Sequence, residues 1–111
     1  MTAVDLDLPE FVRRALAAYR TTPGTCGVVR RPDRELAAQL HQRGVPLAAI
    51  ENALVLAAAR RLARLPGAPP LPVVRSLAYF IPVIEEVLQM GVGPEYFDHV
   101  RRSLLRLLRT Q

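Results

Sequence analysis

The sequence of 111 residues contains no lysine, no tryptophan, one cysteine and two histidines. A single cysteine cannot form an internal disulfide, and a zinc site requires clustered cysteines or histidines. We therefore expect a domain that folds without disulfide, metal or cofactor in a reducing cytoplasm. Cys26 itself stands in a segment rich in glycine and threonine, where it is either a reactive thiol or an incidental small residue.

Long apolar runs are also absent, so the sequence offers no segment of membrane-spanning length. Asp5 and Asp7 make the N-terminus acidic, whereas a signal or transit peptide would be basic there. These two features predict a soluble, unprocessed, cytoplasmic protein without a membrane partner.

Catalytic motifs are missing as well. Glu85 and Glu86 are adjacent, so on a helix they point about 100° apart and do not flank one substrate as an acid/base pair. His41 and His99 accompany no motif for a serine or cysteine nucleophile, and the loop at residues 24–27 lacks the lysine of a phosphate-binding loop. We predict that the protein is not an enzyme and has no catalytic residue.

The residues that are present favour helices. Half of the chain is hydrophobic, with many alanines and leucines, and only 5% is aromatic. This composition indicates an aliphatic helical core rather than a sheet, and the length suits one domain. The predicted fold class is all-α, a compact bundle of about five helices in a single domain, residues 1–111, with a proline-rich connector between the third and fourth helices.

Capping residues and apolar spacing locate the helices. Asp7 is a cap with Pro9 in the following turn, Gly44 ends the second helix, and Pro46 begins a third helix whose long apolar stripe predicts the deepest burial. The expected helices run from Asp7 to about Tyr19, from Pro32 to about Gln42, from Pro46 to about Leu65, from about Val73 to Met90, and from Pro94 nearly to the C-terminus.

Prolines and glycines shape the second half of the chain. Residues 65–72 contain four prolines and are expected to be extended, because proline blocks helix propagation. Pro82 lies inside the fourth helical region, which predicts either a kink or two short helices. Gly91 and Gly93 are expected to end that region.

Positive charge is the strongest chemical feature of the sequence. The net charge is +5, and all 15 basic residues are arginine. Arginine suits bidentate contacts with phosphate, but a GC-rich genome would also favour arginine together with alanine, proline and glycine. Position therefore carries more weight than number: residues 1–10 carry a net −3, residues 11–31 a net +5, and residues 99–111 four arginines and no acid.

These clustered arginines are the predicted binding site for a DNA or RNA backbone. Such clusters neutralise phosphates at several points and give salt-dependent binding that is independent of sequence. The alternative is that arginines in the last turns of helices complement the helix dipole and stay solvated. The candidate residues are Arg13, Arg14, Arg30, Arg31, Arg60, Arg61, Arg64, Arg101, Arg102, Arg106 and Arg109.

The fifth helix supports a second hypothesis, that of a protein-interaction subunit or adaptor. Leu105 and Leu108 flank its inward apolar stripe and are the candidate partner-binding residues. The partner would be a larger protein, a nucleoprotein complex or a second copy of the chain. A nucleoprotein partner would make the two hypotheses compatible.

Residues 36–54 resemble a helix-turn-helix, with Gly44 at the turn and Ile50 in the core. The start of the would-be recognition helix, however, offers only Asn52 as a side chain that suits a base edge. Two packed helices explain the pattern equally well, so we expect contact with phosphates rather than reading of bases.

A family resemblance covers much of this region. In order come a helix, the turn Gly44-Val-Pro-Leu-Ala-Ala-Ile50, an alanine-rich helix ending in arginines, a connector, and the segment Ser76-Leu-Ala-Tyr-Phe80-Ile-Pro-Val-Ile84. Over about residues 33–88 this order resembles the C-terminal helical module of DnaD-type replication-initiation proteins. The resemblance implies DNA binding and helicase loading. The nucleic-acid hypothesis as a whole places the protein in a replication or mobile-element system. Tyr79, Phe80 and Ile84 match the family's aromatic segment, although their spacing is also that of ordinary core residues.

Overall fold

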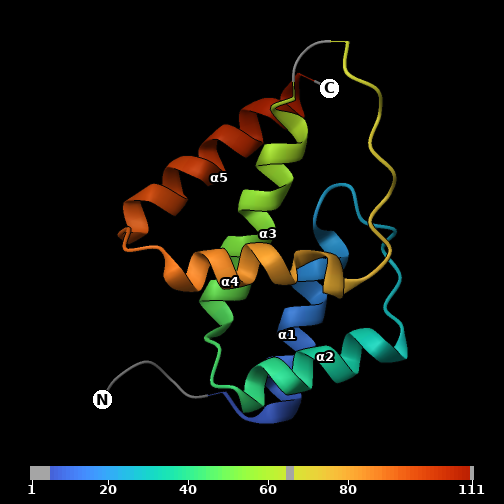
Figure 1. Cartoon of the computed structure of the whole chain (residues 1–111), viewed down its shortest axis with the longest axis vertical. Helices are drawn as coiled ribbons and strands as arrows, with labels where there is room; N and C mark the ends of the chain where they lie inside the picture. The colour runs from blue at the N-terminus through green and yellow to red at the C-terminus, as the bar shows by residue number, and fades with distance from the viewer. Residues whose placement is uncertain (1–5, 65–66, 111) are drawn as a thin grey trace.

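A computed structural model gives the fold and describes residues 6–64 and 67–110. These residues form five α-helices and one 3-10 turn, and no strand (Figure 1). The elements are α1 (Leu8–Thr21), α2 (Arg31–Gln42), α3 (Leu47–Leu62), η1 (Leu77–Phe80), α4 (Ile81–Gln89) and α5 (Pro94–Arg109). The predicted all-α bundle of five helices is confirmed.

Helix α3 is the centre of the bundle, and α1, α4 and α5 each pack against it. Seven of its side chains are buried, including Ile50 and Leu54, so the prediction that it is the most buried helix is confirmed. It ends at Leu62. Leu65, which was predicted at its end, lies outside the described residues.

The ends of the first two helices follow from the capping residues. The Asp7 carboxylate accepts a hydrogen bond from the Glu10 N–H at 3.0 Å, which satisfies a donor of the first turn of α1. Gly44 follows α2 with a φ of +80°, a left-handed conformation that glycine adopts without strain. Both residues act as the sequence predicted.

The prediction of a helix from residue 73 onward is wrong at its start. Residues 73–76 are not helical, because they pair with the loop between α1 and α2: the Val74 N–H donates to the Gly24 carbonyl, and the Cys26 N–H donates to the Val74 carbonyl, both at 2.8 Å. The helical part then consists of η1 followed by α4. Pro82 lies in the first turn of α4, where no N–H is needed, so of the two predicted alternatives the structure has two short helices.

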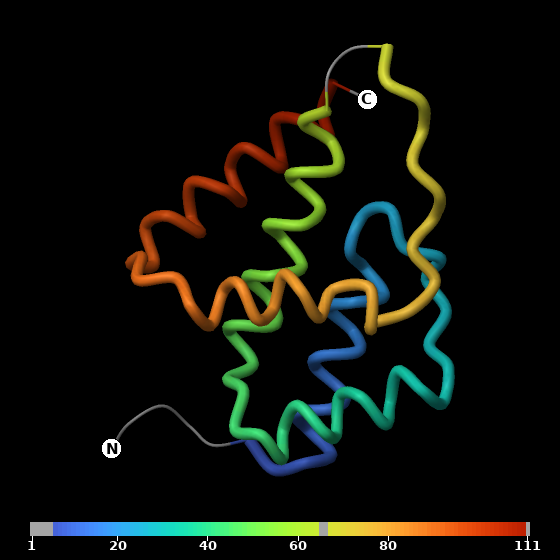
Figure 2. Tube along the Cα trace, viewed as in Figure 1, coloured from blue at the N-terminus to red at the C-terminus, as the bar shows by residue number. Residues whose placement is uncertain are grey.

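Helix α5 lies along α3. Of the four residues whose spacing predicts an inward stripe, Phe97, Val100 and Leu104 are buried and Leu107 is partly exposed. The C-terminal ends of α3 and α5 converge at the same end of the molecule, at the top of Figures 1 and 2. The arginines that close both helices are therefore brought to one end of the fold.

Candidate nucleic-acid interface

The structure divides the arginines into those that pair with acids and those that do not. Five of them form ion pairs: Arg13–Glu10, Arg31–Glu35, Arg43–Glu85, Arg60–Glu86 and Arg101–Asp98. Four of these five belong to the predicted site, and Arg43 does not. A paired guanidinium has its charge offset locally, so these arginines contribute less to a phosphate-binding surface than unpaired ones.

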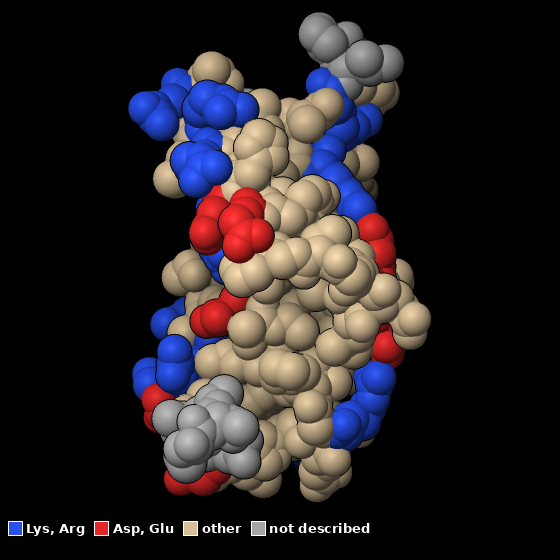
Figure 3. Space-filling view, turned by 90° about the vertical axis from the view of Figure 1, so that its left-hand side faces the viewer, with Lys and Arg blue, Asp and Glu red and all other residues tan. Residues whose placement is uncertain are grey.

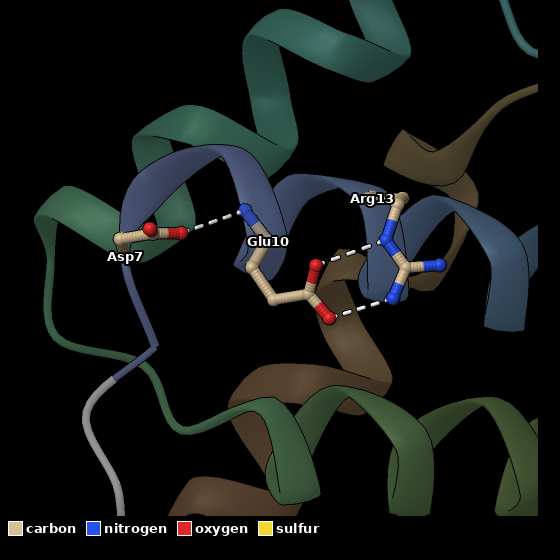
Figure 4. A network of polar contacts seen from close by, with 3 residues as sticks. All are labelled: Asp7, Glu10 and Arg13. Carbon is tan, nitrogen blue, oxygen red and sulfur yellow. Dashed lines mark hydrogen bonds and ion pairs between the residues drawn. The ribbon is translucent and has the colours of Figure 1, made fainter.

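Arg13 shows the local kind of pairing (Figure 4). Its Nε and Nη2 atoms donate to the two carboxylate oxygens of Glu10 at 3.0 and 2.6 Å, and Glu10 is itself held next to the Asp7 cap. The hydrogen bond from Arg13 lowers the pKa of Glu10. Arg14, the next residue, is exposed and forms no ion pair within the described residues. Of the two arginines, Arg14 is the one free to meet a phosphate.

Two long-range pairs fasten α4 to the rest of the bundle. Arg43, just after α2, donates to both carboxylate oxygens of Glu85 at 2.9 and 3.2 Å, and Arg60 on α3 donates in the same way to Glu86, with its Nη1 at 2.8 Å. The two glutamates are thus bound by arginines from different parts of the fold. These hydrogen bonds lower the pKa of both glutamates.

Replacing both glutamates (E85Q/E86Q) is expected to lower the thermal midpoint at neutral pH. A carboxylate whose pKa is lowered by folding stabilises the fold above its unfolded pKa and loses that contribution as the pH falls through the folded value. The difference between the variant and the original chain should therefore be present at pH 7 and vanish well below pH 4.5, the unperturbed value. Thermal unfolding across this pH range tests it, and a difference that persists in acid would contradict an ionic origin.

Arg61 and Arg64 anchor the proline-rich connector to the end of α3. Arg61 donates to the Pro72 carbonyl at 2.7 Å and to the Tyr79 hydroxyl at 3.2 Å, and its guanidinium lies 5.7 Å from the centre of the Tyr79 ring. Arg64 donates to the Pro69 carbonyl. Carbonyl groups satisfy donors without cancelling charge, so both arginines keep their full positive charge at this end of the molecule.

Three arginines of α5 form a stripe on its outer face. Arg102, Arg106 and Arg109 are spaced four and three residues apart, which places them on one side of the helix, and all three are exposed. Arg106 donates to the Ser103 hydroxyl at 3.2 Å, and no ion pair involving any of the three occurs among the described residues. Arg101, by contrast, faces inward and donates to the Asn52 side chain at 2.6 Å.

We call the five acid-free arginines of this region the arginine end: Arg61, Arg64, Arg102, Arg106 and Arg109. Arg61 lies in the last turn of α3, Arg64 lies just beyond the end of that helix, and the other three lie in the second half of α5. The ends of the two helices converge (Figure 1). Figure 3 shows basic side chains gathered at the top of the molecule on both sides of an uncharged strip. The fold thus brings five of the eleven predicted arginines to one end of the molecule, in two groups on either side of the uncharged strip.

Six predicted arginines do not belong to the arginine end. Arg60 and Arg101 lie on α3 and α5 but pair with acids, and the other four lie elsewhere. Arg13 and Arg14 lie on α1, and Arg30 and Arg31 lie at the start of α2, in the other half of the molecule (Figure 1). Arg30 donates to the Arg75 carbonyl at 3.3 Å and approaches the Cys26 sulfur at 3.9 Å. These arginines form at most a separate basic surface.

Three further arginines lie outside the clusters that the sequence predicts. Arg20, Arg34 and Arg75 are exposed, and none of them forms an ion pair in the part of the chain that the structure describes. None of them is adjacent to another arginine in the sequence, so their spacing does not mark them as part of a cluster. They also lie outside the arginine end, which makes them useful as controls.

The residues that match the DnaD-type aromatic segment have two different environments. Phe80 and Ile84 are 1% and 0% exposed and belong to the core, as their helical spacing allows. Tyr79 is 48% exposed and lies against Arg61. Of these three residues, Tyr79 alone is accessible to a ligand.

No family model matches the chain, and neither the curated proteins nor the solved structures contain a significant match. Among residues 6–64 and 67–110, no helix is both long and apolar enough to cross a bilayer, and no three acidic, histidine or cysteine side chains gather as metal ligands. The function must therefore be argued from the side chains themselves.

Proposed function

We propose that the protein binds the phosphate backbone of a nucleic acid through the arginine end and serves as a non-enzymatic accessory factor. The observation that carries the proposal is that the ends of α3 and α5 bring together five arginines without an acidic partner among the described residues. Such a cluster attracts a polyanion over a distance of about one Debye length, roughly 10 Å at moderate salt.

The five arginines would contribute to phosphate binding in two ways. Arg61 and Arg64 use some of their donors on carbonyl groups of the connector, so they supply mainly charge. The stripe on α5 is exposed, and its guanidinium groups can donate two parallel hydrogen bonds to a phosphate.

The helix dipole does not account for the whole cluster. The dipole favours cations only within the last turn of a helix. Arg106 and Arg109 lie in the last turn of α5, but Arg102 lies about two turns before the end. A continuous stripe is the arrangement that tracking along a phosphate backbone requires.

Contact with the backbone is favoured over reading of bases. Asn52, the residue that suits a base edge, already accepts a hydrogen bond from Arg101, and Ala49 beside it is buried. Helix α3, the would-be recognition helix, packs on α1, α4 and α5, so the helix-turn-helix resemblance does not supply a free recognition helix. The resemblance to DnaD-type modules makes DNA the nucleic acid to test first. The protein would then serve in a replication or mobile-element system.

The decisive experiment is a binding titration of the full chain with single-stranded DNA, duplex DNA and RNA at several salt concentrations. If all five arginines meet phosphates of a duplex, the logarithm of the association constant should fall with the logarithm of salt concentration with a slope of about −4.5. Negligible binding at the lowest salt concentration, where Coulomb attraction is strongest, would overturn the proposal.

A protein-interaction module is the second candidate, and the exposure of two leucines favours it. Leu105 is 57% exposed and Leu108 is 38% exposed, on the edge of α5 beside its buried stripe. If the titrations fail while light scattering shows a dimer that L105E abolishes, this second function replaces the first. A nucleoprotein partner would contact both the arginine end and the exposed leucines of α5.

A further inference from the structure

The loop between α1 and α2 presents the one thiol of the protein to solvent. Cys26 is partly exposed and lies between Gly24 and Gly27, whose φ values of +90° and +76° turn the chain on either side of it. The backbone N–H of Cys26 is bound to the Val74 carbonyl, which fixes the residue to the connector. Cys26 is therefore both accessible and held in place.

Two polar groups converge on its sulfur. Arg30 places a guanidinium nitrogen 3.9 Å from Sγ, and the Val28 carbonyl lies 3.7 Å away. From the interior comes Tyr19, whose side chain is 0% exposed. Its hydroxyl makes no hydrogen bond of normal length to any described atom, yet it lies close enough to the thiol for each group to shift the other's pKa.

An unpaired buried hydroxyl is unusual, because burial without a partner costs free energy. Tyr19 is a donor without an acceptor and interacts electrostatically with the thiol, and Arg30 is a cation 3.9 Å from a sulfur atom that solvent reaches. An anionic sulfur, or an oxygen atom attached to it, would supply the acceptor that Tyr19 lacks.

We propose that Cys26 is a peroxide-reactive thiol that is oxidised to a sulfenic acid, with Tyr19 and Arg30 stabilising the thiolate and the added oxygen. The thiolate attacks one oxygen of a hydroperoxide, an S–O bond forms and the O–O bond breaks. Sulfur is oxidised by two electrons, and the leaving hydroxide or alkoxide takes a proton from water. A low-molecular-weight thiol would reduce the product, since the chain has no second cysteine to resolve it.

The electrostatics of the loop agree with this chemistry. A backbone hydrogen bond at Val28, together with Arg30 and Tyr19, lowers the pKa of Cys26 against the opposing effect of burial. Burial, the nearby Asp33 carboxylate and Cys26 raise the pKa of Tyr19 to about 12, so its hydroxyl remains a donor at neutral pH. A larger thiolate fraction speeds the attack, although a less basic thiolate is also a weaker nucleophile.

The test measures the reaction of the full chain with hydrogen peroxide, using a dimedone-type trap and intact mass spectrometry. Because the chain has one cysteine, every adduct reports on Cys26. Trapping at neutral pH should be at least about threefold faster in the folded protein than in the same chain unfolded in urea. A rate no higher than that of the unfolded chain would overturn the proposal.

The variant Y19F tests the role of the hydroxyl without disturbing the fold, since it keeps the ring and removes an unpaired polar atom. We expect peroxide trapping to slow about threefold and the pH midpoint of iodoacetamide alkylation to rise. The matched control Y79F makes the same change at a tyrosine far less buried and should leave both quantities unchanged. If Y19F also leaves them unchanged, Tyr19 does not assist Cys26 and the proposed site is wrong.

Discussion

Replacing Asp33 by alanine should lower the free energy of unfolding by about 3 kcal/mol, because two N–H groups would lose a charged acceptor. Asp33 is 2% exposed and accepts from the Arg30 N–H and from the Leu77 N–H, both at 2.9 Å. The first bond caps α2, and the second holds the start of η1, which is 44 residues away in sequence. One carboxylate therefore joins the two halves of the chain.

Urea unfolding measures this effect, and E35A is the matched control. Glu35 lies on the same helix, but its side chain is 56% exposed, and within the described part of the chain its only ion pair is with Arg31, one turn earlier. Pairs of this kind contribute about 0.5 kcal/mol or less. Equal losses in the two variants would show that the Asp33 hydrogen bonds do not stabilise the fold beyond an ordinary surface contact.

Asp33 also shows where prediction from sequence ends. An acid in the first turn of a helix is a recognisable capping signal, and Pro32–Asp33 correctly marked the start of α2. The bond from Asp33 to Leu77 depends on how the chain returns to α2, which no local pattern encodes. The same limit explains the error at residues 73–76, where a helix was expected but Val74 pairs with the α1–α2 loop.

Helices with strong periodicity and clear caps could be predicted well. The Asp7 cap, the left-handed Gly44, and the stripe of Phe97, Val100 and Leu104 all depend on residues within a few positions of one another. Predictions from such short-range signals hold in the folded chain because the partner residues are always close in space.

The candidate site was only partly predictable, because the sequence shows where arginines stand but not what they meet. The pairs of Arg13 and Arg31 follow from spacings of three and four residues. The pair of Arg60 with Glu86 spans 26 residues and removes from the acid-free cluster an arginine that looked equivalent to its neighbours. The convergence of α3 and α5 likewise comes from packing of the whole bundle.

The convergence of α3 and α5 leads to the second large expected effect, a loss of nucleic-acid binding. Replacing the whole α5 stripe (R102Q/R106Q/R109Q) should reduce the salt slope for duplex DNA by about 3 and weaken binding roughly a thousandfold at about 50 mM salt. Each arginine that leaves a phosphate cancels the release of nearly one counterion, so the loss is largest at low salt. At about 200 mM salt the same variant should lose no more than about a hundredfold.

Loss of three positive charges anywhere would weaken long-range attraction, so the variant needs a control with the same change in charge. R20Q/R34Q/R75Q provides it, because these three arginines are exposed, lack an acidic partner among the described residues and lie outside the arginine end. Contact with phosphates at the arginine end requires the slope to change in the α5 variant and to stay nearly constant in the control. The reverse result would move the binding surface to the half of the molecule formed by α1 and α2, and equal small changes would reduce the interaction to net charge alone.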